Sequence, residues 1–277
     1  MRLLRRLFRR QVGGQVGLVV IGVMILFSFL GPFLYHSDQV HTAIEQATLP
    51  PGPGHLLGTD EVGYDVFGRL MVGGQTSLEV GIAAALIATT FGMLWGAVAG
   101  FAGGLLDGFM MRLVDGLIAI PALFLLIVLG TIATPNVPIL IVVIAAISWL
   151  VPARLIRAET LSLRTREFVE AVRVMGGGNT RIVLRHILPN VIGTVVVNAT
   201  FQVADAILTV AALSFLGLGV PPPAANWGSM LSSGVDFTFA GYWWLIYPAG
   251  FAIVVTVVAF NLVGDALREA LDVRLRI

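Results

Sequence analysis

The sequence predicts an all-α polytopic membrane protein with six transmembrane helices and both chain ends on the cytoplasmic side. Of the 277 residues, 57% are apolar and only 12% are charged, against about 25% charged residues in soluble domains. A bilayer core is crossed by roughly 20 mostly apolar residues. Six runs approach that length, at 16–34, 80–101, 116–132, 137–151, 191–216 and 242–262. Lipid is therefore expected to surround most of the chain.

The first run predicts a retained membrane anchor. It follows five arginines, as a signal peptide would, but it is longer than a typical signal-peptide core and no small-residue cleavage site follows it. We divide the chain into a cytoplasmic Arg-rich start at 1–15, a first helix at 16–34, an extracytoplasmic segment at 35–79, a five-helix core at 80–265 and a cytoplasmic tail at 266–277.

The distribution of arginine predicts the orientation. All 17 basic residues are Arg, and 16 of them fall on one side if both chain ends are cytoplasmic. Arg69 is the exception, in the segment before the second run. Because loops rich in basic residues stay in the cytoplasm, this distribution predicts an N-in, C-in topology.

Two prolines affect the third and fourth spans. Pro121 is expected to break the third span, and the short fourth span is expected to continue past Pro152.

Small residues predict how the second helix packs. Small residues recur at every fourth position, at Ala84, Ala88, Gly92, Gly96, Gly100 and Gly104. Such a ridge lets helix backbones approach closely in lipid. It predicts tight packing within the chain or with a partner, with a pore lining as the alternative.

Two groups of residues are expected at the membrane boundaries. Asp107 and Asp115, with Arg112 between them, predict an interfacial ion-pair group. An aromatic belt at the membrane surface is expected from Trp227, Tyr242, Trp243 and Trp244.

Missing residue types and motifs exclude several functions. Without Cys there is no thiol nucleophile, disulfide framework or iron–sulfur cluster. Without Lys the chain has no Walker A loop, so it does not bind ATP through a P-loop of its own. No H-E-x-x-H or G-x-S-x-G motif occurs, and His36, His41 and His55 are expected to be solvated loop residues. We therefore expect no catalytic, cofactor or metal site in this chain.

The connection at 152–190 is expected to carry the function. It holds seven arginines and a predicted helix over 165–175, followed by the glycines at 176–178. Asn179 is expected to cap a second short helix. The first helix has an apolar stripe at Phe168, Val169, Val172 and Met175. Such a segment could bind anionic lipid, nucleic acid or another protein. The stripe and the sharp turn favour a docking element for a protein, and no nucleic acid is expected.

The same connection resembles the EAA loop of ABC-importer permeases. Glu170-Ala171-Val172 is followed by Gly176 after six positions and by Pro189 after thirteen more, within the string His186-Ile187-Leu188-Pro189. This spacing is similar to E-A-A, three residues, Gly, nine residues and I-x-L-P. Val172 and His186 depart from the general pattern.

The resemblance extends over nearly all of the chain from about residue 55. The blocks Leu57-Gly58-Thr59-Asp60 and Ala212-Leu213-Ser214-Phe215-Leu216-Gly217 are similar to those of the C-type subunit of dipeptide and oligopeptide permeases. Tyr64 and Gln75 stand where relatives usually carry Arg, and Val210 where many carry an acidic residue. These departures leave the translocated solute open.

The resemblance implies a type I ABC importer permease fold in a bacterial plasma (inner) membrane. It implies a second homologous permease, two cytoplasmic ABC ATPases that bind ATP and Mg, and an extracytoplasmic binding protein that delivers a peptide. The residues expected to couple to the ATPases are Phe168, Glu170, Ala171, Val172, Met175, Gly176, Arg185 and Pro189.

Asp205 is the one carboxylate well inside a predicted span. An intramembrane charge is a candidate for a role in transport, and a hydrogen bond to a neighbouring helix or subunit is the structural alternative. An ion-coupled secondary transporter that uses Asp205 is the rival function. A membrane enzyme and a scaffold that only anchors an ATPase are weaker rivals.

Overall fold

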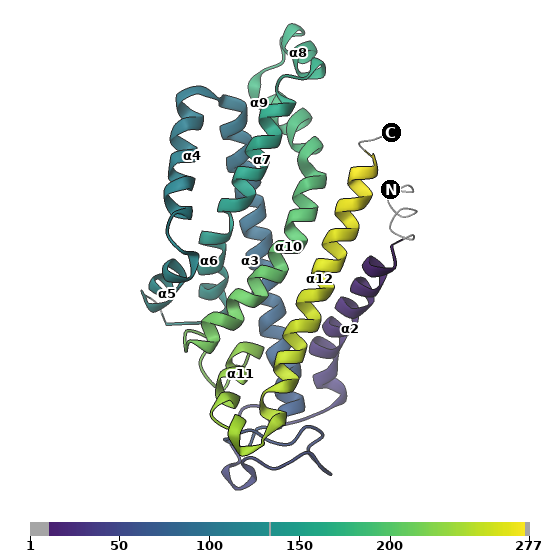
Figure 1. Ribbon diagram of the computed structural model, residues 1–277, viewed down its shortest axis with the longest axis vertical. Helices are drawn as coiled ribbons and strands as arrows, with labels where there is room; N and C mark the ends of the chain where they lie inside the picture. Colours follow the sequence, from purple (N-terminus) through teal and green to yellow (C-terminus); the bar gives the residue numbers. More distant parts are fainter. Residues whose placement is uncertain (1–10, 133, 275–277) are drawn as a thin grey trace.

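Four long helices form the centre of an elongated bundle in the computed structural model, which describes residues 11–132 and 134–274 (Figure 1). These are α2 (Val12–Leu34), α3 (Val66–Ala102), α10 (Leu188–Phe215) and α12 (Tyr247–Arg274). Apart from two isolated bridges, no strand occurs within the described ranges. The chain is all-α, as predicted.

Two further pairs of helices are bent. The pair α4 (Gly104–Ile118) and α5 (Ala122–Ile132) is bent by 85°, and the pair α6 (Val137–Ser148) and α7 (Leu150–Leu163) by 42°. Pro121 stands in the first break, as predicted, because proline removes a backbone donor and restricts the residue before it. Counting each bent pair as one span gives six candidate spans.

The helices extend beyond the apolar runs that predicted them. α3 begins at Val66 rather than at residue 80, capped by the Asp65 carboxylate, which accepts a hydrogen bond from the backbone N–H of Gly68 at 2.8 Å. α4 begins at Gly104 rather than at residue 116. Hydropathy detects contact with lipid, whereas these extra turns carry polar residues that the protein itself covers, such as Ser77, which is 2% exposed.

The small-residue ridge of α3 packs against α7 within this chain, as one of the two packing alternatives predicted. A Cβ added at Gly92 would lie 2.7 Å from the backbone oxygen of Trp149, and one at Gly100 would lie 2.8 Å from that of Arg157. At Gly96 the added atom would collide with the backbone oxygen of Ala153. Gly104 does not belong to this ridge, since it begins α4 and an added Cβ there meets nothing within 4 Å.

The ion pairs at the boundary differ from the predicted group. Asp107 accepts two hydrogen bonds from the Arg157 guanidinium, at 2.6 and 2.7 Å. Asp115 pairs with Arg154. Both arginines come from α7, so these ion pairs join α4 to α7. The predicted partner, Arg112, lies on the same helix as the carboxylates and does not pair with them in the structure.

Trp227 is not part of an aromatic belt, in contrast to the prediction. It begins α11 (Trp227–Val235) and is fully buried. Its indole N–H donates to the backbone oxygen of Leu70 at 2.9 Å, and its backbone N–H donates to the Ser77 hydroxyl at 3.1 Å. Trp244 is also buried, and of these tryptophans only Trp243 is substantially exposed, at 48%.

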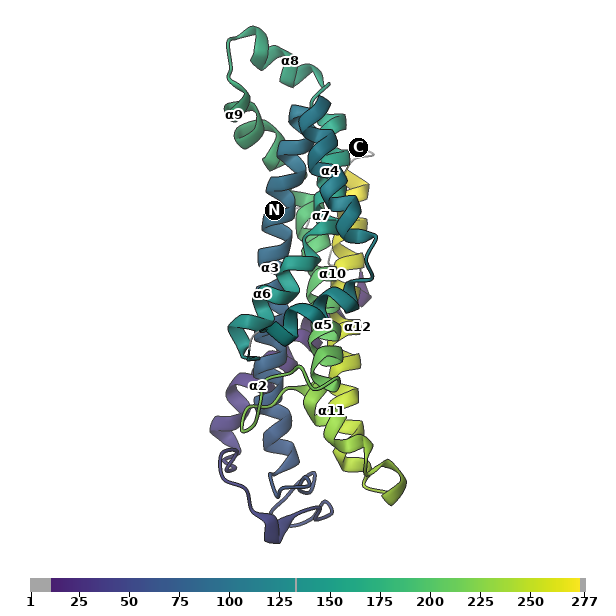
Figure 2. The same ribbon diagram turned by 90° about the vertical axis from the view of Figure 1, so that its left-hand side faces the viewer.

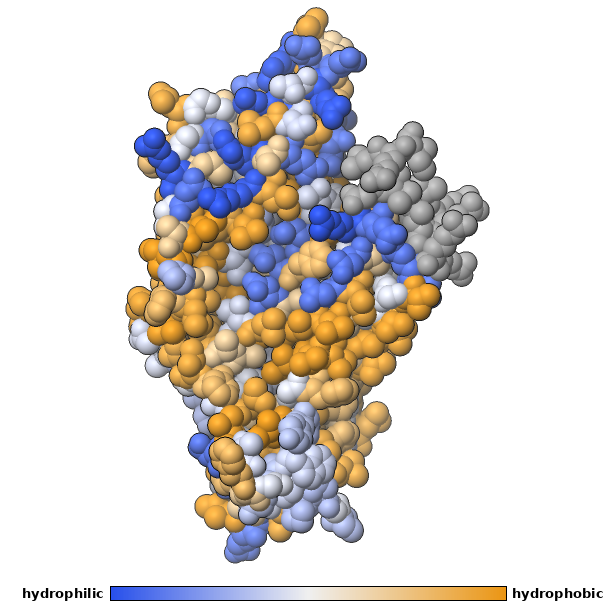
Figure 3. Space-filling model, in the orientation of Figure 1, coloured by the Kyte–Doolittle hydropathy of each residue, from blue (hydrophilic) through white to orange (hydrophobic). Residues whose placement is uncertain are grey.

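The surface has a broad apolar middle and a hydrophilic end at α8. Figure 3 shows a broad apolar area across the middle of the bundle and hydrophilic side chains gathered at the end that carries α8 (Glu167–Val174). Many large apolar side chains of α2 and α12 are exposed, among them Leu18, Val19, Phe251 and Val254. Such a surface suits lipid as its solvent.

The α3–α7 contact gives a first prediction. Replacing Gly96 with Ala should destabilise the fold by about 1–3 kcal/mol, because overpacking forces backbones apart. The matched control is Gly108→Ala in α4, where an added Cβ meets nothing within 4 Å. It should be neutral or slightly stabilising, because Ala has the higher helix propensity. Thermal unfolding in detergent measures both, and equal melting temperatures for the two variants would contradict the packing argument.

Candidate functional site

The α8–α9 connection projects from one end of the bundle (Figure 2). α8 is followed by Gly176, whose φ of +79° is a left-handed conformation that favours glycine. α9 (Asn179–Ile182) then continues through a π-helical segment, η2 (Val183–Ile187), into α10. The predicted helix, glycine turn and helix are present. Gly178 rather than Asn179 occupies the N-cap, and no side chain caps α9.

One side of the connection is built into the bundle. Val169, Ile182 and Ile187 are each fully buried and pack in one cluster with Ala97 of α3 and Ile156 of α7. Val172 is half-buried against the same cluster. Part of the predicted apolar stripe therefore packs the connection against the bundle, and α8 stands on a buried base.

The other side of α8 is exposed. Phe168 is 38% exposed and Met175 77% exposed. The other predicted coupling residues, Val172 apart, are also exposed: Glu170, Ala171, Gly176, Arg185 and Pro189. Val174 was not predicted, although it is 89% exposed beside Met175. It lies off the sequence stripe, and only the packing of Val169 and Val172 shows which side of α8 remains free.

Charged side chains tie the base of the connection to the bundle. Arg164 donates to the backbone oxygen of Gly100 at 3.1 Å, and the Arg173 guanidinium lies 5.7 Å from the ring centre of Phe101. With the Arg157–Asp107 pair, these contacts link α7 and α8 to the ends of α3 and α4. The base of α8 is therefore in contact with α3 and α7, and α7 in turn is joined to α4.

Asp205 lies on an exposed face of α10, near Leu208, which is 46% exposed. Within the described residues, the Asp205 carboxylate has no hydrogen-bond or ion-pair partner.

The three residues that depart from the family pattern contribute to packing in this chain. Gln75 donates to the backbone oxygen of Ser28 at 2.8 Å, Tyr64 is 4% exposed, and Val210 is fully buried.

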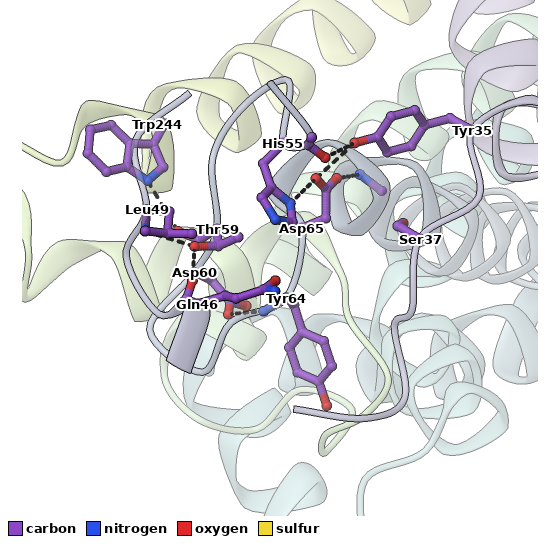
Figure 4. A network of polar contacts seen from close by, with 12 residues as sticks. Tyr35, Ser37, Gln46, Leu49, His55, Thr59, Asp60, Tyr64, Asp65 and Trp244 are labelled. Carbon is purple, nitrogen blue, oxygen red and sulfur yellow. Dashed lines mark hydrogen bonds and ion pairs between the residues drawn. The ribbon is translucent and has the colours of Figure 1, made fainter. Parts of the chain in front are cut away.

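The folded segment before α3 lies at the opposite end of the bundle (Figure 1), and Figure 4 shows its polar contacts. Asp65 accepts a hydrogen bond from the Tyr35 hydroxyl at 2.9 Å and faces the Nδ1 atom of His55 at 3.0 Å. The sequence predicted a solvated loop residue at His55. In the structure its ring is held in a polar network with Asp65. No group of three or more metal-ligating side chains occurs in the part of the chain that the structure describes.

Thr59 and Asp60 hold the segment before α3 together through hydrogen bonds. Thr59 accepts a hydrogen bond from the backbone N–H of Leu49 at 2.8 Å, and its backbone oxygen accepts one from the Trp244 indole at 3.2 Å. Burial raises the pKa of Asp60, although the N–H of Tyr64 and the guanidinium of Arg69 partly counteract this effect.

Comparisons with known proteins identify the family. The family described as "Binding-protein-dependent transport system inner membrane component" matches residues 92–277, and the "N-terminal TM domain of oligopeptide transport permease C" matches residues 1–51. The oligopeptide transport system permease protein OppC of Escherichia coli is 42% identical over 97% of this chain and 89% of that protein. OppC of Bacillus subtilis is 39% identical over 97% and 88%, and the dipeptide transport system permease protein DppC of the same organism is 37% identical over 98% and 85%. This chain therefore belongs to the family of inner-membrane components of binding-protein-dependent transport systems.

Proposed function

We propose that this chain is a permease subunit of an ATP-driven importer that carries peptides. It forms the translocation pathway with a second homologous permease, and two cytoplasmic ABC ATPases and an extracytoplasmic binding protein complete the importer. The observation that carries the proposal is the exposed tip of α8, which stands on a buried base. The names of the relatives support a dipeptide or oligopeptide as the solute.

The charge distribution supports a cytoplasmic position for α8. α2 starts and α12 ends on the side of the bundle toward α8 (Figure 1). The arginines of α7, α8 and α9 lie at that end, whereas Arg69 lies near the start of α3 at the other. The positive-inside rule therefore supports a cytoplasmic position for α8, where ATP is available.

Coupling requires that the docked α8 favour a different membrane arrangement in each state of the ATPases. A partner shifts an equilibrium only by its difference in affinity for the two states. Phe168, Val174 and Met175 supply apolar contact area in the ATPase cleft, which is where binding energy concentrates. Glu170 pairs with an ATPase-side cation or helix N-terminus, and Ala171 allows close approach. ATP and Mg are bound by the ATPases, and this chain supplies no cofactor site.

The conformational change would travel from α8 into the bundle through the contacts described above. Val169 and Val172 press on α3 and α7, while Arg157 carries the displacement to α4 through Asp107. The bends between α4 and α5 and between α6 and α7 are the places where a rigid displacement can become a change of helix angle.

Glu170→Arg should detach the ATPases. Charge reversal at the docking tip is expected to lower ATPase recovery with the tagged permease at least tenfold, because like charges at an interface oppose association. The matched control is Glu269→Arg, the same charge change at an exposed position of α12. Affinity purification from mild detergent measures both, and equal ATPase recovery from the two variants would contradict the assigned docking surface.

Gly176→Val should leave the protein inserted in the membrane but uncouple transport. The φ of +79° strains a β-branched residue by about 1–3 kcal/mol, and no neighbour within this chain lies within 4 Å of an added Cβ, so the strain within the chain comes from the backbone. Gly178→Val is the matched control, with a φ of −69° and equally open space. Peptide uptake should fall only for Gly176→Val. Its absence from the membrane would instead indicate a folding defect.

Uptake should stop when ATP is depleted and continue when ion gradients are collapsed. Asp205→Asn removes the charge that an ion-coupled carrier would need. An ATP-driven importer does not use that charge, so this variant should keep the ATP dependence of the parent. Uptake into proteoliposomes with ATP inside, with and without an ionophore, measures this. Uptake driven by an ion gradient without ATP, and lost in Asp205→Asn, would favour the secondary transporter instead.

A further inference from the structure

A cavity of about 210 Å³ lies at the end of the bundle opposite α8. The segment before α3 forms one wall, and residues 220–224 with α11 and Leu245 form the other. Asp60, Tyr64 and Leu245 are buried at its floor, whereas Thr42, Pro222 and Ser233 at its rim are exposed. The cavity is therefore open to solution and has a protected interior.

The interior carries one more carboxylate than it has cations. Asp60, Glu61 and Arg69 are the charged side chains in its lining. Arg69 is already engaged, since its Nε atom lies 3.4 Å from the Asp60 carboxylate, its Nη1 atom 3.4 Å from the backbone oxygen of Pro223, and its guanidinium 4.2 Å from the ring centre of Tyr64. Asp60 also accepts hydrogen bonds from two backbone N–H groups, those of Val62 and Tyr64.

Glu61 is left without a matching charge. Its Oε2 atom is buried, and it has no hydrogen-bond donor among the described residues. A buried carboxylate oxygen is costly unless it is paired. Burial and the negative charge of Glu61 both raise the pKa of Asp60, in keeping with two neighbouring carboxylates of which only Asp60 is paired with Arg69.

The size and lining of the cavity restrict the ligand. Sites for drug-sized molecules have volumes of about 300–1,000 Å³, so a cavity of about 210 Å³ suits one side chain or terminal group. No three metal-ligating side chains converge in the described part of the chain. Val66, Met230 and Leu245 provide apolar walls, which suit an aliphatic stem that ends in a charged head.

We propose that this cavity binds one organic cation, an alkylammonium or guanidinium group, with the Glu61 carboxylate as its counter-ion. The cavity lies at the other end of the bundle from α8, and the choice of a cation rests on its lining alone, whereas the two candidate sources of that cation rest on the proposed function. Two sources share this chemistry: the amino terminus or a basic side chain of a peptide solute, and a basic side chain of the binding protein.

The absence of Cys from the sequence allows a direct test. Ser233→Cys places a single thiol at the exposed rim of the cavity. Its reaction rates with a cationic (trimethylammonium-ethyl) and an anionic (sulfonatoethyl) methanethiosulfonate reagent are measured on the full chain in detergent and divided by the rates of a free thiol. At about 4 Å in water a unit negative charge speeds the cationic reagent and slows the anionic reagent by about fivefold each, so the corrected rates should differ by about 25-fold in favour of the cation.

Glu61→Gln should abolish this preference without changing side-chain size. Glu45→Gln is the control, an exposed carboxylate of the same segment outside the cavity lining, and it should leave the preference unchanged. Equal rates for the two reagents, or a preference that survives Glu61→Gln, would overturn the proposal.

Protection of the rim thiol tests binding itself and identifies the source. Argininamide should slow the labelling by an uncharged reagent when Glu61 is present and should not do so in Glu61→Gln, and no protection in either would overturn the proposal. A peptide solute and the purified binding protein are then compared, and the one that protects the thiol is the natural source. None of these measurements needs ATPases or transport, so their failure is distinct from failure of the proposed function.

Discussion

The close contact between the backbones of α3 and α7 is the constraint on which the rest of the structure depends. In lipid, apolar side chains gain little by leaving their solvent, so helices associate through close packing and polar contacts. Gly92, Gly96 and Gly100 let the start of α7 approach so closely that backbone oxygens lie within 2.8 Å of where a Cβ of α3 would be. This approach brings Arg154 and Arg157 to the carboxylates of α4, and it brings α7 to the place where α8 begins. The surface proposed to meet the ATPases is therefore positioned by three glycines that do not touch them.

The two ends of the bundle solve the same physical problem in different ways. Where helices leave the lipid, their polar groups need partners. At the end that carries α8, guanidinium groups pair with carboxylates and backbone oxygens between helices. At the opposite end, the folded segment before α3 supplies the partners. Its Asp65 carboxylate caps α3 and also accepts a hydrogen bond from the Tyr35 hydroxyl. One end thus joins its helices by charged contacts, whereas the other encloses a cavity whose lining carries an excess negative charge.

The apolar stripe of α8 separates what holds this helix from what it presents. Val169 is buried against α3 and α7, and Phe168, Val174 and Met175 are exposed on the other side. A helix of eight residues is too short to be stable by itself, so its buried side must fix it before its free side can bind a partner. Stability and docking therefore use adjacent residues, and a substitution in α8 has to be tested for both.

The sequence by itself determined the class of the fold, the six candidate spans, the glycine turn at Gly176 and the resemblance to permeases. These features depend on local composition and spacing, which neighbours in space do not alter. It could not determine that Trp227 is buried, that Asp107 pairs with Arg157, or that α3 begins at Val66, because each depends on residues far away in the chain. The tertiary structure also decided that Val169 faces inward and Val174 outward, since a periodic pattern marks an apolar side and only packing shows whether protein covers it.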